Sequence, residues 1–133
     1  MNLIKKIFFR IYQKRVINYT NDLCYHMNQV YHYILSSNQS VQDRQAIAEA
    51  IGLLETWKKI STNVYKHIAS NTSIEIDHDS KLVDITKKIL NIEIDYIIKN
   101  QSEKIVQELK KEACARVDDY FDSNQVIVSK GDK

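Results

Sequence analysis

The segment from residue 75 to residue 84 holds the side chains best suited to acid–base or metal chemistry. It contains four carboxylates and one imidazole, from Glu75, Asp77, His78, Asp79 and Asp84. Such groups bind metal ions and transfer protons. However, their spacing matches no calcium-binding loop, and no second His-Asp pair completes the ligand set of a metal phosphohydrolase. We expect a polar loop in which Asp79 or Ser80 caps the next helix, and we keep a metal-dependent enzyme centred on Asp77, His78 and Asp79 as the least favoured function.

No other pattern in the chain predicts catalysis. Asp22 and His26 lie one helical turn apart, but a di-iron bundle needs Glu-x-x-His pairs, which the sequence lacks. A Gly-x-Ser-x-Gly turn and a glycine-rich phosphate loop are also missing, since the only glycines are Gly52 and Gly131. We therefore predict that the protein is not an enzyme and has no catalytic residues, no bound metal and no cofactor.

The cysteines and the remaining histidines predict structural roles. Cys24 and Cys114 are ninety residues apart and show no metal-ligand spacing, so we expect buried free thiols rather than a disulfide. His32 and His67 are isolated along the sequence, and isolated histidines on helices usually pack or lie at the surface.

The first twenty residues are strongly basic. They contain five cations and no acid, whereas the whole chain has a net charge of only +2. The cations are Lys5, Lys6, Arg10, Lys14 and Arg15, and aromatic residues lie between them. Such a surface attracts phosphate backbones and anionic membranes, although nucleic-acid-binding domains usually have a more basic balance. The alternative is the solvated face of a core helix, with long side chains extending over its apolar stripe.

Tyrosine is concentrated in the same part of the chain, and five of the eight tyrosines fall between residues 12 and 33. Their spacing distributes them around a helix, so they cannot all face one core. Exposed tyrosine is enriched at protein interfaces. We therefore predict a protein interface that draws on Phe9, Tyr12, Tyr19, Tyr25, Tyr31 and Tyr33.

The elements that must position these residues are predicted to be long helices, because the chain contains no proline and two glycines. Apolar residues recur every three or four positions over residues 3–35, with polar residues near Asn18 that could kink the helix. A second helix is expected from Ser40 to Ala69, with a stripe comprising Ile47, Ile51, Leu54, Trp57, Ile60, Val64 and Ile68. Residues 81–121 form either one further helix or two that meet at Asn100.

The fold class predicted from these patterns is all-α, an antiparallel bundle of three or four long helices with short polar turns. Two runs, residues 73–77 and 125–129, have strand-like patterns. They can pair as a minor two-stranded ribbon if the chain reverses at Asn100. We expect residues 1–122 to form a single helical domain and residues 123–133 to form a tail that is partly disordered or contains a short strand.

The predicted function follows from these features. Hydrophobic residues at 44% and charged residues at 27% are typical of a globular protein. The sequence shows no signal peptide and no membrane span, so we expect a cytoplasmic protein. We predict a non-enzymatic protein–protein interaction module: a small helical adaptor, inhibitor or assembly protein that binds another protein or a second copy of itself. The alternative is a nucleic-acid-binding protein that uses the basic N-terminal helix.

Overall fold

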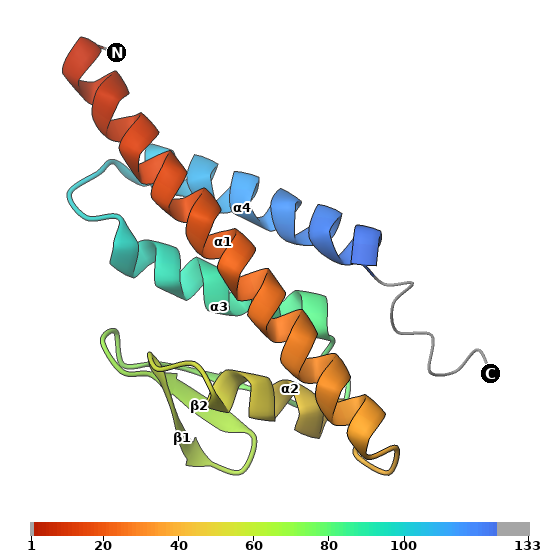
Figure 1. Cartoon of the computed structure of the whole chain (residues 1–133). Coiled ribbons are helices and arrows are strands. Elements are labelled where there is room, and N and C mark those ends of the chain that lie inside the picture. Colours follow the sequence, from red (N-terminus) through yellow and green to blue (C-terminus); the bar gives the residue numbers. More distant parts are fainter. Residues whose placement is uncertain (1, 125–133) are drawn as a thin grey trace.

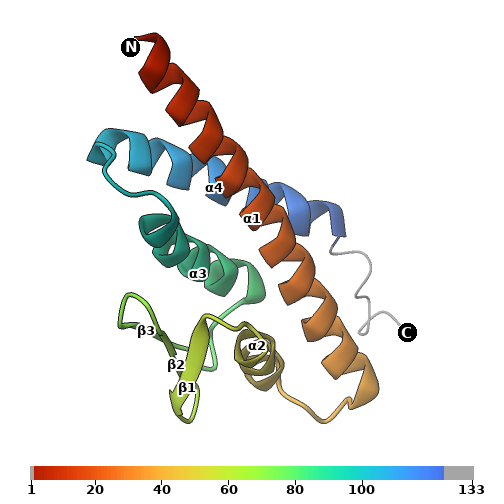
Figure 2. The same cartoon turned by 60° about the vertical axis from the view of Figure 1, so that its left-hand side comes forward.

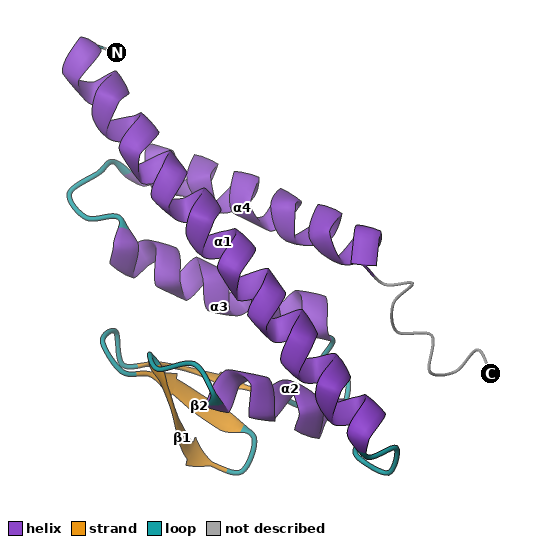
Figure 3. Ribbon diagram, in the orientation of Figure 1, coloured by secondary structure: helices purple, strands orange, loops and turns teal. Residues whose placement is uncertain are grey.

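The computed structural model describes residues 2–124, which form four helices and one three-stranded antiparallel sheet (Figure 1). The helices are α1 (Leu3–Ser37), α2 (Asp43–Gly52), α3 (Leu82–Ile97) and α4 (Glu103–Asn124). The strands are β1 (Trp57–Ser61), β2 (Val64–His67) and β3 (Thr72–Glu75), in the order β1-β2-β3. The sheet lies with α2 at one end of the molecule (Figure 3). The prediction of a mostly helical fold is confirmed, but the sheet is larger than the predicted ribbon.

Helix α1 extends from one end of the molecule to the other without a break (Figures 1 and 2). At its start the side chain of Asn2 accepts a hydrogen bond from the backbone N–H of Lys5 at 2.8 Å. The kink expected near Asn18 is absent. The hydroxyl of Thr20 donates to the carbonyl of Val16 at 2.6 Å, so it is satisfied within the helix. Because α1 contacts α2, α3 and α4, its packing outweighs the weak helix propensity of the polar residues near Asn18.

The prediction of a long second helix is wrong. Helix α2 ends at Gly52, and residues 57–75 form the sheet instead. Five members of the expected helical stripe therefore lie outside α2, namely Leu54, Trp57, Ile60, Val64 and Ile68. Trp57 is buried at the start of β1, whereas Ile60 and Ile68 are about half exposed. In β2 the buried residues alternate, with Tyr65 and His67 facing the core. Residues 57–75 are rich in β-branched and aromatic residues, which favour strands. Pairing between the strands outweighed the helical spacing of the apolar residues in this segment.

Asparagine makes the turns that glycine would ordinarily make. Asn63, Asn71 and Asn100 have φ of 63°, 59° and 62°, the left-handed conformation that asparagine tolerates better than most residues. Asn63 lies in the tight turn between β1 and β2, where Ser61 pairs with Val64. Asn71 lies just before β3, which pairs with β2. A chain with almost no glycine can therefore still form two hairpins.

Residues 81–121 form two helices, because the chain reverses between α3 and α4 (Figure 2). The carboxyl end of α3 leads to Asn100 in its left-handed conformation, and the hydroxyl of Ser102 then accepts from the backbone N–H of Ile105 at 3.3 Å. The reversal lets α4 pack along both α3 and α1. At the start of α3, Lys81 rather than Ser80 is the N-cap residue, so that expected cap is wrong.

The buried core draws residues from every helix and from the sheet. Its fully buried side chains include Val16 and Met27 of α1, Ile47 and Ile51 of α2, Ile85, Ile89 and Ile94 of α3, and Leu109 and Val117 of α4. Each such side chain contributes about 1.5–3 kcal/mol when it leaves water. The strand-like run at residues 73–77 overlaps β3, but its partner is β2. The other run, at residues 125–129, and the predicted tail beyond residue 124 lie outside the described residues.

Candidate interaction surfaces

The first three turns of α1 extend beyond the rest of the molecule, and we call residues 3–15 the arm (Figures 1 and 2). Five of its apolar side chains are exposed: Leu3 (73%), Ile4 (64%), Ile7 (48%), Phe8 (50%) and Ile11 (48%). We call these five residues the apolar stripe. The arm meets the body near Gln13, whose amide donates to the carboxylate of Glu112 on α4 at 3.1 Å.

The apolar stripe faces largely away from the body. Phe9 and Tyr12 are partly buried and pack against the core, so they continue the inward face of α1. Ile7 and Ile11 each lie two residues from Phe9, and two residues correspond to about 200° of rotation in an α-helix, so they point to the opposite side. Phe8 lies one turn before Tyr12 and forms the flank of the stripe nearest the body. The sequence pattern showed apolar residues on more than one face of this helix but could not show which face the body covers.

The predicted basic residues of the arm remain on the surface. Lys5, Lys6, Arg10, Lys14 and Arg15 are all exposed. Lys6, Arg10 and Lys14 follow one another at four-residue spacing, which places them in one row beside the apolar stripe. The arm is therefore both cationic and amphipathic, and its apolar side has no partner among the described residues.

The predicted aromatic interface divides into two groups. Phe9, Tyr12, Tyr19 and Tyr31 are partly buried and pack against the core, whereas Tyr25 and Tyr33 are exposed by 60% and 72%. Burial, followed by the charge of the Glu93 carboxylate and a hydrogen bond to it, raises the pKa of Tyr19 far above its ordinary value. Only Tyr25 and Tyr33 of this set present most of their surface to a partner.

An open apolar groove of about 650 Å³ lies beside Tyr33. Its lining comes from α1 (Gln29, Val30, Tyr33 and Ile34), from the end of α2 with the residue that follows it (Glu49, Gly52 and Leu53), and from β2 (Tyr65). Leu53 is 66% exposed at its edge. Burial raises the pKa of Tyr65, and the charge of Glu49 adds to the effect. The groove therefore has one acidic side chain, Glu49, beside its apolar wall. Sequence patterns did not find the groove, because it depends on the early end of α2.

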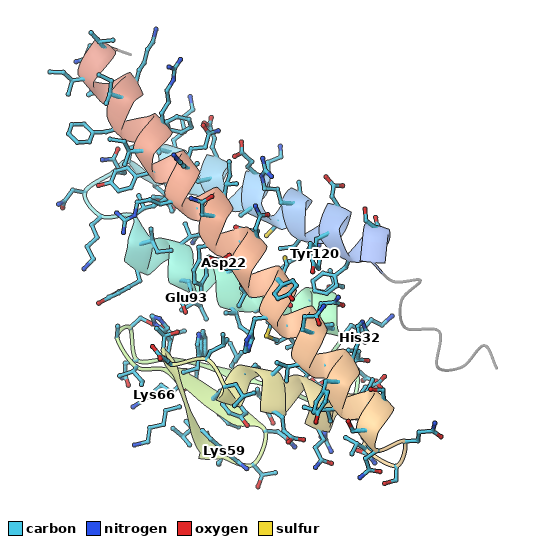
Figure 4. The ribbon with its side chains drawn as sticks, viewed as in Figure 1. Asp22, His32, Lys59, Lys66, Glu93 and Tyr120 are labelled. Atoms are coloured by element: carbon cyan, nitrogen blue, oxygen red, sulfur yellow. The ribbon has the colours of Figure 1, made fainter. Side chains whose placement is uncertain are left out.

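A buried polar cluster joins the sheet to α3, and Figure 4 shows Glu93 pointing from α3 toward the sheet. The Glu93 carboxylate accepts from the hydroxyl of Thr56 at 2.7 Å and the indole N–H of Trp57 at 3.0 Å. Its other oxygen lies 3.0 Å from Nε2 of His67, and Nδ1 of His67 lies 2.8 Å from Oγ of Ser70. An acid inside the apolar run of residues 89–98 is the sequence signal that could have indicated this cluster.

The Ser70 hydroxyl, the His67 imidazole and the Glu93 carboxylate follow one another in the order of a hydrolase catalytic triad. However, the burial and the other partners of these groups favour a structural role. A relay histidine passes its proton to a leaving group and must therefore reach the substrate. The side chain of His67 has no exposed surface, and its ring packs against the rings of Trp57 and Tyr96. Glu93 is also occupied by further donors, which are the hydroxyls of Thr56 and Tyr19 and the indole N–H of Trp57. The cluster satisfies buried polar groups between β2 and α3.

The loop at residues 75–84 forms a local turn. The Asp77 carboxylate accepts from the backbone N–H of Asp79 at 3.0 Å and from the hydroxyl of Ser80 at 3.1 Å, and these contacts lower the pKa of Asp77. His78 and Asp79 are largely exposed, with 3.6 Å between Nε2 of His78 and Oδ1 of Asp79. Within residues 2–124, no three histidine, cysteine or acidic side chains gather as a metal site would require.

The remaining candidate residues have internal partners. Nε2 of His26 lies 2.8 Å from the carbonyl oxygen of Ala50, so His26 contacts α2. Both cysteines are free: Cys24 is buried on α1, and Cys114 is partly buried on α4. Burial raises the pKa of the Cys24 thiol to about 12.

Comparisons with protein-family models, with curated proteins and with solved structures found no match for this chain. None of the helices in the described part of the chain combines the length and the apolar character that a membrane span requires.

Proposed function

We propose that this protein is a non-enzymatic interaction module whose groove binds an amphipathic helix of a partner protein. The observation that carries the proposal is the groove between α1, α2 and β2, which has two highly exposed side chains, Tyr33 and Leu53, at its edge. Large apolar side chains at a concave surface supply most of the contact energy in protein interfaces. Adaptors, inhibitors and assembly proteins of this size act through such surfaces.

The chemistry of the lining indicates what the partner presents. Val30, Ile34 and Tyr65 offer apolar and aromatic contact, and Glu49 adds a negative charge. A partner helix with apolar residues at positions i, i+3 or i+4 and i+7 can fill an apolar groove with one face. A lysine or arginine beside that face complements Glu49. A second copy of this chain is one source of such a helix, so self-association belongs to the proposal.

Site-specific photo-crosslinking tests the groove. A photoreactive amino acid in place of Leu53 is expected to form an adduct with one partner, mapped by mass spectrometry to an amphipathic helix. The additional substitution Tyr33→Ser should reduce the yield of that adduct about tenfold, because it removes a large exposed aromatic side chain from the lining of the groove. The control position is Ile60, which is 49% exposed on β1 and does not line the groove. Equal adduct yields at positions 53 and 60 would contradict the proposal.

Light scattering over a dilution series tests self-association. If the partner is a second copy, the mean mass should rise with concentration, and Leu53→Ser should shift the curve to higher concentration. A chain that remains monomeric at high micromolar concentration removes the second copy as the partner, and the crosslinking result then decides the rest of the proposal.

A further inference from the structure

The apolar stripe of the arm is a narrow row of exposed side chains along a projecting stretch of helix. Residues 3–11 extend over about 13 Å at a rise of about 1.5 Å per residue. Protein interfaces close around a well-packed core with a polar rim. A lipid bilayer accepts the apolar face of an amphipathic helix without a shaped partner surface.

The distribution of charge on the arm indicates the chemistry of its partner. Lys6, Arg10 and Lys14 form a row along one side of the apolar stripe, and Lys5 and Arg15 add two further cations. No acid occurs in this part of the chain. Long cationic side chains beside an apolar face can reach lipid phosphates while the apolar residues enter the acyl boundary. Leucine, isoleucine and phenylalanine on one face with lysine and arginine on the other are typical of helices that lie in a membrane interface.

We infer that the arm binds the surface of a membrane that contains anionic lipids, with Leu3, Ile4, Ile7, Phe8 and Ile11 inserted among the lipids and the basic residues contacting the headgroups. Because the apolar stripe faces largely away from the body, the body does not obstruct this contact. The arm then holds the protein at the membrane, and the groove lies toward the far end of α1. This inference does not depend on the partner proposed for the groove.

Nucleic acid is the competing partner for the cations of the arm. Phosphate backbones recognise lysine and arginine through counterion release, but isoleucine and leucine add little to phosphate contacts. The exposed apolar stripe therefore favours a membrane. The two partners differ in the residues that they require, since a membrane needs both the stripe and the cations, whereas a nucleic acid needs the cations.

Co-sedimentation of the full chain with lipid vesicles tests the inference. Vesicles of phosphatidylcholine with 30% phosphatidylserine should bind the protein, and pure phosphatidylcholine should bind it at least about a hundredfold more weakly, since each of the three cations in the row Lys6, Arg10 and Lys14 contributes roughly fivefold near an anionic surface. Ile7→Ser with Phe8→Ser should weaken binding by roughly thirtyfold or more. Lys6→Gln with Arg10→Gln should weaken it by about twentyfold. All four substituted residues are exposed, and circular dichroism should show an unchanged fold.

Matched variants on the sheet provide the controls. Ile60→Ser with Ile68→Ser changes two isoleucines that are 49% and 56% exposed, and Lys59→Gln with Lys66→Gln removes two lysines that lie far from the arm (Figure 4). Both controls should bind the anionic vesicles as the wild type does. Inorganic phosphate at millimolar concentration should not compete.

Three results would overturn the inference. The first is wild-type vesicle binding by the Ile7→Ser, Phe8→Ser variant, and the second is competition by inorganic phosphate alone. The third is an absence of vesicle binding at low salt together with salt-dependent binding to duplex or single-stranded nucleic acid that the same variant retains. That last result would assign the arm to nucleic acid.

Discussion

The Glu93 carboxylate on α3 lies 3.0 Å from Nε2 of His67 on β2, and both side chains are buried. The backbone N–H of Ser70 donates to Nδ1 of His67 at 3.3 Å, so a neutral His67 carries its proton on Nε2 and donates it to Glu93. Together with the bonds from Thr56 and Trp57, this contact attaches the sheet to the helices at a point where no apolar residue could satisfy the donors.

Replacing Glu93 should destabilise the protein strongly. Glu93→Ala leaves the buried N–H groups of Trp57 and His67 without their acceptor, so the free energy of unfolding should fall by about 3–5 kcal/mol. Glu93→Gln keeps one acceptor oxygen and should cost less, about 1–3 kcal/mol. Urea unfolding followed by circular dichroism measures both values. The control is Asp95→Ala, which removes the ion pair between the exposed carboxylate of Asp95 and the partly buried Lys110 and should cost about 1 kcal/mol or less. Similar losses in Glu93→Ala and Asp95→Ala would show that the cluster contributes little.

The left-handed residue between α3 and α4 offers a second test. Asn100 has φ of 62°, and a β-branched residue is strained in that conformation. Asn100→Val should lower the free energy of unfolding by about 1–2 kcal/mol, whereas Asn100→Gly should change it by less than about 0.5 kcal/mol, because glycine adopts positive φ freely. Asn18→Val, at an exposed helical position on α1, serves as the comparison for a change to valine. If Asn100→Val is as stable as Asn100→Gly, the left-handed turn does not constrain the reversal.

Alkaline unfolding tests the environment of Tyr31. Burial raises the pKa of Tyr31 to about 12, and the charge of Asp43 and a hydrogen bond to it add to the effect. Tyrosine in an unfolded chain ionises near pH 10. Because the folded pKa is the higher one, the contribution of Tyr31 to stability is complete below about pH 10 and is lost as the pH rises to about 12. Tyr31→Phe cannot ionise, so its urea midpoint should fall less steeply than that of the wild type between these pH values.

The same pH series includes a variant that removes only one cause of the raised pKa of Tyr31. Asp43→Asn removes the charge but not the burial, so its slope with pH should lie between those of the wild type and Tyr31→Phe. At pH 7, Tyr31→Phe should be less stable than the wild type by about 1 kcal/mol, because the hydrogen bond to Asp43 is lost. Identical slopes in all three proteins would mean that another group controls alkaline unfolding.

The helical parts of the fold could be predicted because their signals are local. The apolar spacing in residues 3–35 predicted α1. Asn100 with the polar residues after it marked the place where residues 81–121 could divide into two helices, and of the two alternatives left open there the structure contains the reversal. The sheet could not be predicted in the same way. Trp57, Ile60, Val64 and Ile68 fit a helical period, and only the pairing of β1, β2 and β3 with one another makes residues 57–75 extended.

The candidate surfaces show the same division. The sequence by itself determined that the first twenty residues are basic and free of acids, that tyrosine is concentrated between residues 12 and 33, and that most of the chain is helical. Only the tertiary structure decided which face of α1 is covered, so that Phe9 packs inward while Ile7 and Phe8 are exposed. It also decided that Glu93 meets His67 and that Leu53 borders a groove. The periodicity of the sequence gives the direction of each side chain around its own helix axis. Contacts between elements depend instead on where the chain turns. In this protein asparagine residues with positive φ form three of those turns.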